Sequence, residues 1–215
     1  FNVGNQVGEA TAAHQRLSRK VRDERVVSIL RKVEIPSPEV RIHDFPHQLS
    51  GGMRQRVVGA IAFSCEPQVL IADEPTTSLD VTVQLQYLKL LKDVQAQTRL
   101  AILFITHDFG VVANVCDRVV VMYAGRIVEM GTVREIFNSP LHPYTKALMR
   151  SIPDLDEKTQ TLGFIEGEPP ALHHMPQGCV FRPRCLEHGD VCCDNEYPPQ
   201  RQVGPGHLVS CWRTP

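Results

Sequence analysis

The sequence has no long hydrophobic run and no excess of charge of either sign. Its longest apolar stretches, at 69–72, 100–105 and 119–123, are much shorter than the roughly 20 residues that a membrane-spanning helix needs. With 23 basic and 24 acidic residues the formal net charge is −1, so the composition provides no general attraction to nucleic acid or to anionic lipid. We therefore expect any association with a membrane to depend on a partner protein.

A charged-then-apolar leader is also missing at Phe1, so no secretory signal is indicated, and we expect the chain to begin inside a longer gene product. What is present fits a globular protein. The 215 residues are 42% hydrophobic and 22% charged, enough to bury a core. Because 11 of the 16 prolines lie in residues 139–215, the composition predicts one large domain followed by a loop-rich extension.

Hydrophobic periodicity predicts the secondary structure of the first part of the chain. It indicates helices over 3–33, 52–64, 81–97 and 109–116, and strands over 68–73, 100–106, 118–123 and 126–130. The strand–helix–strand order predicts a parallel crossover, and the short apolar strands are expected to be buried on both faces. The Ala124-Gly125 turn predicts a hairpin at the edge of the same sheet. The expected core is α/β.

Asp73 and Glu74 follow four apolar residues that predict a buried strand, and His107 ends the next predicted strand. Open α/β sheets place their ligands at the carboxyl ends of their strands, so the two carboxylates predict a site for phosphate chemistry. Taken singly, the acidic pair is also consistent with a turn cap and His107 with an ordinary loop histidine, because short motifs match by chance.

Ser50-Gly51-Gly52 precedes a predicted helix. Glycines allow backbone amides to approach a phosphate closely, and a helix N-terminus carries a partial positive charge, so this turn predicts an anion site. An N-cap serine followed by flexible glycines explains the start of the helix equally well.

Taken in chain order, these segments resemble one family. Leu-Ser-Gly-Gly-Met at 49–53, Val-Leu-Ile-Ala-Asp-Glu-Pro at 69–75, Ser-Leu-Asp at 78–80 and His107 resemble the ATPase subunit of ATP-binding-cassette (ABC) transporters. The resemblance implies an α/β, P-loop NTPase-like ABC ATPase core with a helical subdomain. It divides the chain into part of the helical subdomain at 1–48, the core at 49–138 and a C-terminal extension at 139–215.

The resemblance also implies roles for single residues. Asp73 would hold Mg²⁺, Glu74 would orient or deprotonate the attacking water, and His107 would act as a donor near the γ-phosphate of ATP. The segment that begins Leu-Ser-Gly-Gly-Met at residue 49 resembles the ABC signature, which would contact ATP held by a partner subunit. The loop with Ser-Leu-Asp at 78–80 would cross the same dimer interface. These two segments supply the expected nucleotide-binding residues Ser50, Gly51, Gly52, Gln55 and Asp80.

No Gly-x-x-x-x-Gly-Lys-[Ser/Thr] segment occurs in the sequence. This segment and its lysine supply most of the direct phosphate contacts in such ATPases. We therefore expect a partial core that lacks the Walker A half and is inactive alone. An alternative is a non-catalytic module that contributes only its signature motif to a partner's ATP site. An ABC ATPase of DNA repair would need long heptad arms and a basic surface, and neither is present.

Leu141 to Leu148 is similar to the C-terminal extension of oligopeptide and dipeptide transporter ATPases. The similarity implies a subunit that energises import of peptides, nickel or related solutes from the cytoplasmic face of the membrane. The implied partners are a second ATPase subunit, two transmembrane permease subunits and, indirectly, a solute-binding protein, with no nucleic acid. Residues 3–12 would lie near the permease.

Four cysteines of the extension, Cys179, Cys185, Cys192 and Cys211, are spaced as C-x5-C-x6-C-x18-C. In a proline-rich segment of a cytosolic protein, this grouping predicts a metal more than disulfides. The spacing resembles the tail of peptide-importer ATPases with a [4Fe-4S] cluster, and Zn²⁺ is the alternative. Because Cys193 offers a second thiol beside Cys192, the identity of the third ligand stays open. Two further alternatives stay open. One is a mixed Cys/His zinc site that includes His173, His174, His188 or His207, and the other is a set of reduced cysteines that bind no metal.

Overall fold

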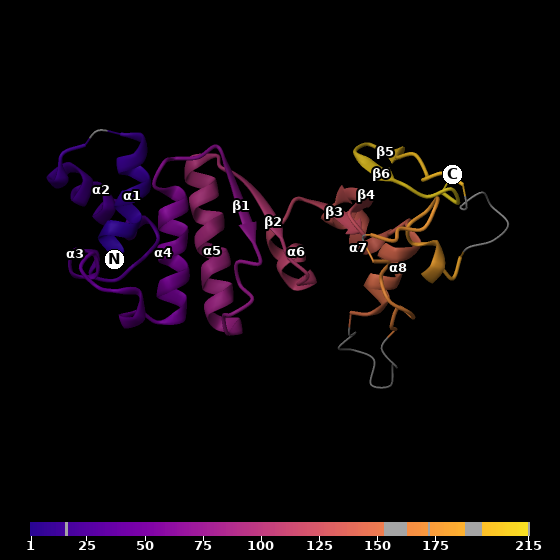
Figure 1. The fold of residues 1–215 in the computed structure, drawn as a ribbon, viewed down its shortest axis with the longest axis horizontal. Coiled ribbons are helices and arrows are strands. Elements are labelled where there is room, and N and C mark those ends of the chain that lie inside the picture. The colour runs from indigo at the N-terminus through magenta and orange to yellow at the C-terminus, as the bar shows by residue number, and fades with distance from the viewer. Residues whose placement is uncertain (16, 153–162, 172, 188–194, 215) are drawn as a thin grey trace. The chain divides into compact units, whose positions relative to one another are not determined.

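A computed structural model of the protein describes residues 1–15, 17–152, 163–171, 173–187 and 195–214. By internal contacts the chain divides into two compact units, Phe1–Val111 and Val112–Pro215 (Figure 1). The division into segments 1–48, 49–138 and 139–215 that the family resemblance implies is a separate matter and stays a prediction. None of the described helices is both long and apolar enough to span a membrane.

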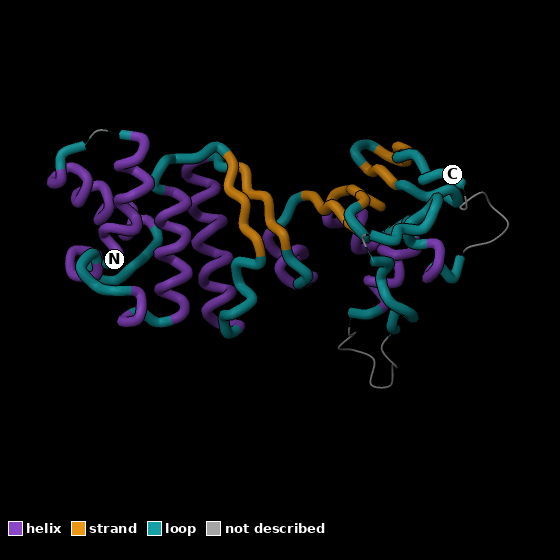
Figure 2. The backbone as a smooth tube through the Cα atoms, in the orientation of Figure 1, coloured by secondary structure: helices purple, strands orange, loops and turns teal. Residues whose placement is uncertain are grey.

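The first unit is mainly helical (Figure 2) and contains the two short strands β1 and β2. Its elements are α1 Val3–His14, α2 Arg19–Lys32, α3 Pro38–Arg41, the 3-10 turn η1 Pro46–Gln48, α4 Gly51–Phe63, β1 Val69–Asp73, α5 Val81–Thr98 and β2 Ala101–Ile105. Helices α4 and α5 lie side by side in Figure 1, with β1 and β2 next to α5. The predicted helices at 52–64 and 81–97 and both strands are therefore confirmed.

The helix predicted over 3–33 is interrupted. Helix α1 ends at His14, and α2 begins after Ser18, whose hydroxyl accepts a hydrogen bond from the backbone N–H of Val21 at 3.5 Å. The break lets α1 and α2 pack on each other and bury Val7 and Leu30 in one core. The prediction was wrong here because apolar residues recur at the same helical spacing in both helices, so the pattern does not reveal the break between them.

Strands β1 and β2 pair in parallel, with Asp73 opposite Ile105, which confirms the predicted crossover. One face of the pair packs Leu70, Ile102 and Phe104 against the helical core. The other face is open, since Val69, Ile71 and Leu103 are 59%, 64% and 53% exposed. The expectation of strands buried on both faces is therefore wrong, because the helical core packs against only one side of the pair.

The second unit is built on an antiparallel sheet. Helix α6 Phe109–Val115 spans the boundary between the units, and the second unit continues with β3 Arg118–Tyr123, β4 Arg126–Thr132, α7 Val133–Asn138, α8 Pro143–Arg150, the 3-10 turn η2 Arg182–Arg184, β5 Arg201–Gly204 and β6 His207–Val209. The strand order is β3-β4-β6-β5. Tyr123 packs against Tyr144 and Phe181, with ring centroids 4.7 and 5.1 Å apart.

The predicted hairpin of β3 and β4 is confirmed, with Ala124 and Gly125 at φ angles of 47° and 76° in its turn. Its predicted place is wrong, because β4 pairs with β6 in a four-stranded sheet and the β1–β2 pair is a separate sheet. Strands β5 and β6 were not predicted. They are only four and three residues long, too short for a clear alternating pattern. Strand β6 forms by pairing with β4, far away in the sequence, and β5 pairs with its sequence neighbour β6 at the edge of the sheet.

Candidate functional site

Glu74 and His107 meet where β1 and β2 end. Nδ1 of His107 lies 2.7 Å from Oε1 of Glu74, and the Thr77 hydroxyl donates to Oε2 of Glu74 at 2.7 Å. The backbone N–H of Glu74 also donates to the carbonyl of Ile105 at 2.9 Å, which fixes the first residue after β1 to the end of β2. The sequence-predicted carboxylate and histidine are therefore brought together by the parallel register of the two strands.

A cavity of about 170 Å³ opens beside this pair and is lined by Glu74, Thr76, Thr77, Leu79, Gln84, Thr106, His107 and Asp108. Sequence reasoning missed Thr77. The available signal was a hydroxyl side chain three residues after the carboxylate, within the same turn. Because the cavity is polar and open to solvent, the carboxylate and the imidazole can both reach a bound water or phosphate.

The backbone at Glu74 has a φ of 45°, in the left-handed region. This conformation costs a residue with a Cβ roughly 1–2 kcal/mol. Strained backbone of this kind persists where neighbouring contacts hold it, here the hydrogen bonds from Thr77 and His107. The turn thus directs the carboxylate toward His107.

The electrostatics of the pair follow from the same contacts. The Thr77 hydrogen bond, followed by that of His107, lowers the pKa of Glu74. Glu74 in turn raises the pKa of His107, first by the hydrogen bond and then by its charge. The ionised carboxylate and the protonated imidazole therefore coexist over a wider pH range than the isolated side chains would allow.

Asp73, the predicted Mg²⁺ ligand, ends β1 on the same face as the exposed Ile71. It is solvent-exposed and is not among the described residues that line the cavity. An exposed carboxylate is an oxygen ligand of the kind that Mg²⁺ prefers. The residue type fits the ion, and the metal role of Asp73 stays a prediction.

The predicted signature residues form the start of α4. The Ser50 hydroxyl accepts from the backbone N–H of Met53 at 3.3 Å, so Ser50 is the N-cap. A Cβ added to Gly51 would meet nothing within 4 Å, whereas one added to Gly52 would lie 2.6 Å from Cγ1 of Val83. Gly51 is thus open to a ligand, and Gly52 is required for the close approach of α4 to α5.

Two further predicted residues also connect to α5. Gln55 of α4 hydrogen-bonds to the phenol of Tyr87. Asp80 is the N-cap of α5, where its carboxylate accepts from the backbone N–H of Val83 at 3.0 Å. The signature turn and the Asp80 loop are therefore both fixed to the first turns of α5, although they are about 30 residues apart in the sequence.

In the second unit, Cys179, Cys185 and Cys211 line one small cavity together with His142 and Trp212. Burial raises the pKa of the Cys185 thiol. Cys192, Cys193 and His188 lie outside the described residues. Within the described part, no group of three or more His, Cys, Asp or Glu side chains is arranged to hold a metal ion. The iron–sulfur cluster and the zinc alternative therefore have no support and stay predictions.

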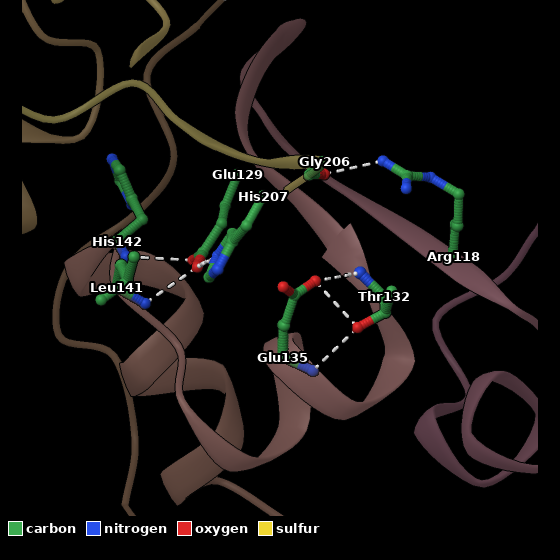
Figure 3. Close-up of polar contacts among 8 residues, drawn as sticks. All are labelled: Arg118, Glu129, Thr132, Glu135, Leu141, His142, Gly206 and His207. Carbon is green, nitrogen blue, oxygen red and sulfur yellow. Dashed lines mark hydrogen bonds and ion pairs between the residues drawn. The ribbon is translucent and has the colours of Figure 1, made fainter. Parts of the chain in front are cut away.

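His207, considered above as a zinc ligand, contacts a buried carboxylate instead. Its Nε2 lies 2.8 Å from Oε1 of Glu129, which is completely buried (Figure 3). Glu129 also accepts hydrogen bonds from the backbone N–H groups of Leu141 at 2.8 Å and His142 at 3.0 Å. One carboxylate thus joins β4, β6 and the start of α8.

His142 is a buried N-cap whose ring must stay unprotonated. Its Nδ1 accepts from the backbone N–H of Tyr144 at 3.1 Å, and burial lowers the pKa of the ring from 6.5 to about 4. Between these two values the unfolded chain binds a proton and the folded chain does not, so acid favours unfolding. The histidine therefore makes the second unit less stable as the pH falls from 6.5 toward 4.

We expect the free energy of unfolding of the second unit to fall by about 2 kcal/mol from this group alone between pH 7 and pH 5. Urea unfolding followed by the fluorescence of Trp212, the single tryptophan, measures this loss. Asparagine also caps helices and does not titrate, so His142→Asn is expected to flatten the pH dependence. An equally steep dependence in the variant would contradict the assignment.

Comparisons with known proteins give the family of the chain. The family model described as "ABC transporter" matches residues 3–77, and the one described as "Oligopeptide/dipeptide transporter, C-terminal region" matches residues 128–192. The chain belongs to the ABC transporter family. As an ABC protein it is similar in structure to cbiO1 of Clostridium perfringens, part of an ABC transporter complex, with 33% identity and a TM-score of 0.57 over 64% of this chain and 53% of that one.

A dimeric bacterial ABC transporter cassette is also similar, with 26% identity and a TM-score of 0.54 over 62% of this chain and 57% of that one. Both neighbours confirm the α/β ABC ATPase core. Among curated proteins, the dipeptide transport ATP-binding protein DppD of Bacillus subtilis is 51% identical over 99% of this chain and 63% of its own length. The oligopeptide transport ATP-binding protein OppD of Escherichia coli is 44% identical over the same shares.

This ABC chain therefore spans 63% of the length of these two relatives. The comparisons give no support to the alternative of a non-catalytic module. The expectation that the chain is inactive alone is not confirmed by any of them and stays a prediction.

Proposed function

We propose that this chain acts in an ATP-binding and ATP-hydrolysing subunit that energises import of peptides or related solutes. The observation that supports the proposal most directly is the Glu74–His107 pair beside an open polar cavity, in a chain similar to dipeptide and oligopeptide transport ATP-binding proteins. The subunit would work at the cytoplasmic face of the membrane with a second ATPase subunit and two permease subunits, and indirectly with a solute-binding protein.

In this proposal Glu74 orients the attacking water. Its lowered pKa keeps the carboxylate ionised at neutral pH but makes it a weak base. The transition state of phosphoryl transfer is loose and needs positioning and charge stabilisation more than early proton removal. Orientation of the water therefore agrees better with the geometry than its full deprotonation by Glu74.

His107 supplies the positive charge. Its raised pKa favours the protonated ring, which can donate to the γ-phosphate while its Nδ1 stays on Glu74. Bound Mg²⁺, held by Asp73, would neutralise charge on the β- and γ-phosphates. The open backbone at Gly51 and the Ser50 N-cap would bind the phosphates of ATP held by the partner subunit.

The proposal is tested in the assembled transporter, reconstituted in lipid vesicles with its permease subunits. Peptide uptake should require ATP and Mg²⁺, and Asp73→Asn should reduce both uptake and hydrolysis by about 100-fold. Asp93→Asn, a change of the same kind at an exposed position of α5, is the matched control and should leave both unchanged. Peptide uptake that persists without ATP, or in the Asp73 variant, would contradict the proposal.

A further inference from the structure

Gln84 is a side chain of the cavity to which nothing above assigns a role. It lies on α5, is partly buried, and donates through Nε2 to Oδ2 of Asp108 at 3.0 Å. Both residues line the same cavity as Glu74 and His107. The contact joins the first turns of α5 to the loop that follows β2.

Asp108 uses both of its carboxylate oxygens. Oδ1 accepts from the backbone N–H groups of Gly110 at 2.8 Å and Val111 at 3.2 Å, which fixes the first turn of α6. Oδ2 is left for Gln84. The backbone N–H of Asp108 donates to the Thr106 hydroxyl at 3.1 Å, so the residues on both sides of His107 are fixed.

The bond from Gln84 to Asp108 is stronger than an ordinary one, because its acceptor is charged. The Gln84 hydrogen bond is the largest cause of the lowered pKa of Asp108, so the carboxylate is ionised at neutral pH. Asp108 itself lies next to His107 in the chain. The contacts of Asp108 therefore hold the loop that carries the imidazole that contacts Glu74.

At its other end Gln84 is fixed to the Asp80 loop. The backbone N–H of Gln84 donates to the carbonyl of Asp80 at 2.8 Å, so the two residues are one helical turn apart. The first turn of α5 thus forms a rigid connection between the Asp80 carboxylate and the Gln84 amide.

We propose that Gln84 is a positioning residue that couples the Asp80 loop to His107 through Asp108. A displacement of the start of α5 shifts Asp108, and with it the donor that faces the Glu74 carboxylate. The catalytic consequence depends on the function proposed above and on the family resemblance, which implies that the Asp80 loop lies at the interface with a second ATPase subunit. The mechanical link between α5 and the His107 loop does not depend on it.

Gln84→Met tests the link, since methionine has a similar length and shape but no hydrogen-bond donor. In the full 215-residue chain, hydrogen exchange at the amides of Gly110 and Val111 should become about tenfold faster, because Asp108 loses one of its supports. Gln84→Lys restores a donor to the carboxylate and should bring exchange back toward the wild-type rate. Gln86→Met, at an exposed position of the same helix, is the matched control and should leave exchange unchanged.

In the assembled transporter, Gln84→Met should lower kcat for ATP about tenfold and leave KM unchanged, because ATP binding does not use this contact. Gln84→Lys should recover most of the loss, and Gln86→Met should behave as wild type. Equal exchange rates in Gln84→Met and wild type would overturn the link. Faster exchange with normal kcat would show a purely structural contact and would also overturn the positioning role.

The two proposals fail in different ways. A wild-type assembly without ATP-dependent uptake would contradict the proposed function and remove the catalytic part of the inference. The exchange rates at Gly110 and Val111 would still decide whether Gln84 holds the loop that carries His107.

Discussion

Replacing Glu74 by glutamine is expected to lower ATP turnover of the assembled transporter by about 100-fold to 10,000-fold. Glutamine has the same length and retains an acceptor for the Thr77 hydroxyl, so the turn should keep its shape. The amide cannot carry the negative charge that pairs with His107, and its oxygen is a poorer acceptor for water. ATP binding should persist, so the variant should retain nucleotide without turning it over.

The measurement is the steady-state rate of phosphate release together with the amount of nucleotide retained on the transporter. Glu66→Gln is a matched control, since Glu66 is also a glutamate with a left-handed backbone, at a φ of 50°, and is exposed. This control should hydrolyse ATP at the wild-type rate. Normal phosphate release by Glu74→Gln would remove the catalytic assignment of the pair.

Replacing Glu129 by alanine is expected to reduce the free energy of unfolding of the second unit by about 3–5 kcal/mol, because it removes a fully buried carboxylate and leaves its hydrogen-bond partners buried. The change leaves the backbone N–H groups of Leu141 and His142 and the ring of His207 without their buried acceptor. Because Glu129 on β4 joins these groups of β6 and of the start of α8, the β4–β6 pairing and the start of α8 are expected to loosen together.

Urea unfolding followed by Trp212 fluorescence reports this loss, since the single tryptophan lies in the second unit. Glu129→Gln retains one acceptor oxygen and should lose less stability than Glu129→Ala. Glu168→Ala removes an exposed carboxylate from the same unit and should change stability by less than about 0.5 kcal/mol. Equal stability of the Glu129 and Glu168 alanine variants would show that the carboxylate does not hold these elements together.

Much of the first unit was predictable from local patterns. The starts of α4 and α5 follow from cap residues, Ser50 and Asp80, each of which accepts the backbone N–H three residues later. The strands β1 and β2 follow from short apolar runs, one between these two helices and one after α5. The exposed face of the strands was not predictable, because the same apolar run results whether a second layer covers the strand or not.

In the candidate site, too, some residues were identified from the sequence and others only from the structure. Glu74 and His107 were identified from their residue types and their positions at strand ends, and the parallel register confirms their proximity. Thr77 and Gln84 were missed, since neither residue type is unusual in a turn or on a helix. Their roles appear only when the distances to Glu74 and Asp108 are known.

The sequence by itself determined the family, the order of the elements from α4 to β2 and the carboxylate–histidine pair, because these depend on residue type and short-range spacing. Only the tertiary structure decided that α1 and α2 are separate helices, that β6 pairs with β4, and that Glu129 accepts from His207, 78 residues away. The last two depend on contacts between segments far apart in the sequence, and the separation of α1 from α2 lets the apolar faces of these helices pack on each other. No local pattern of residues encodes the partner that each segment finds.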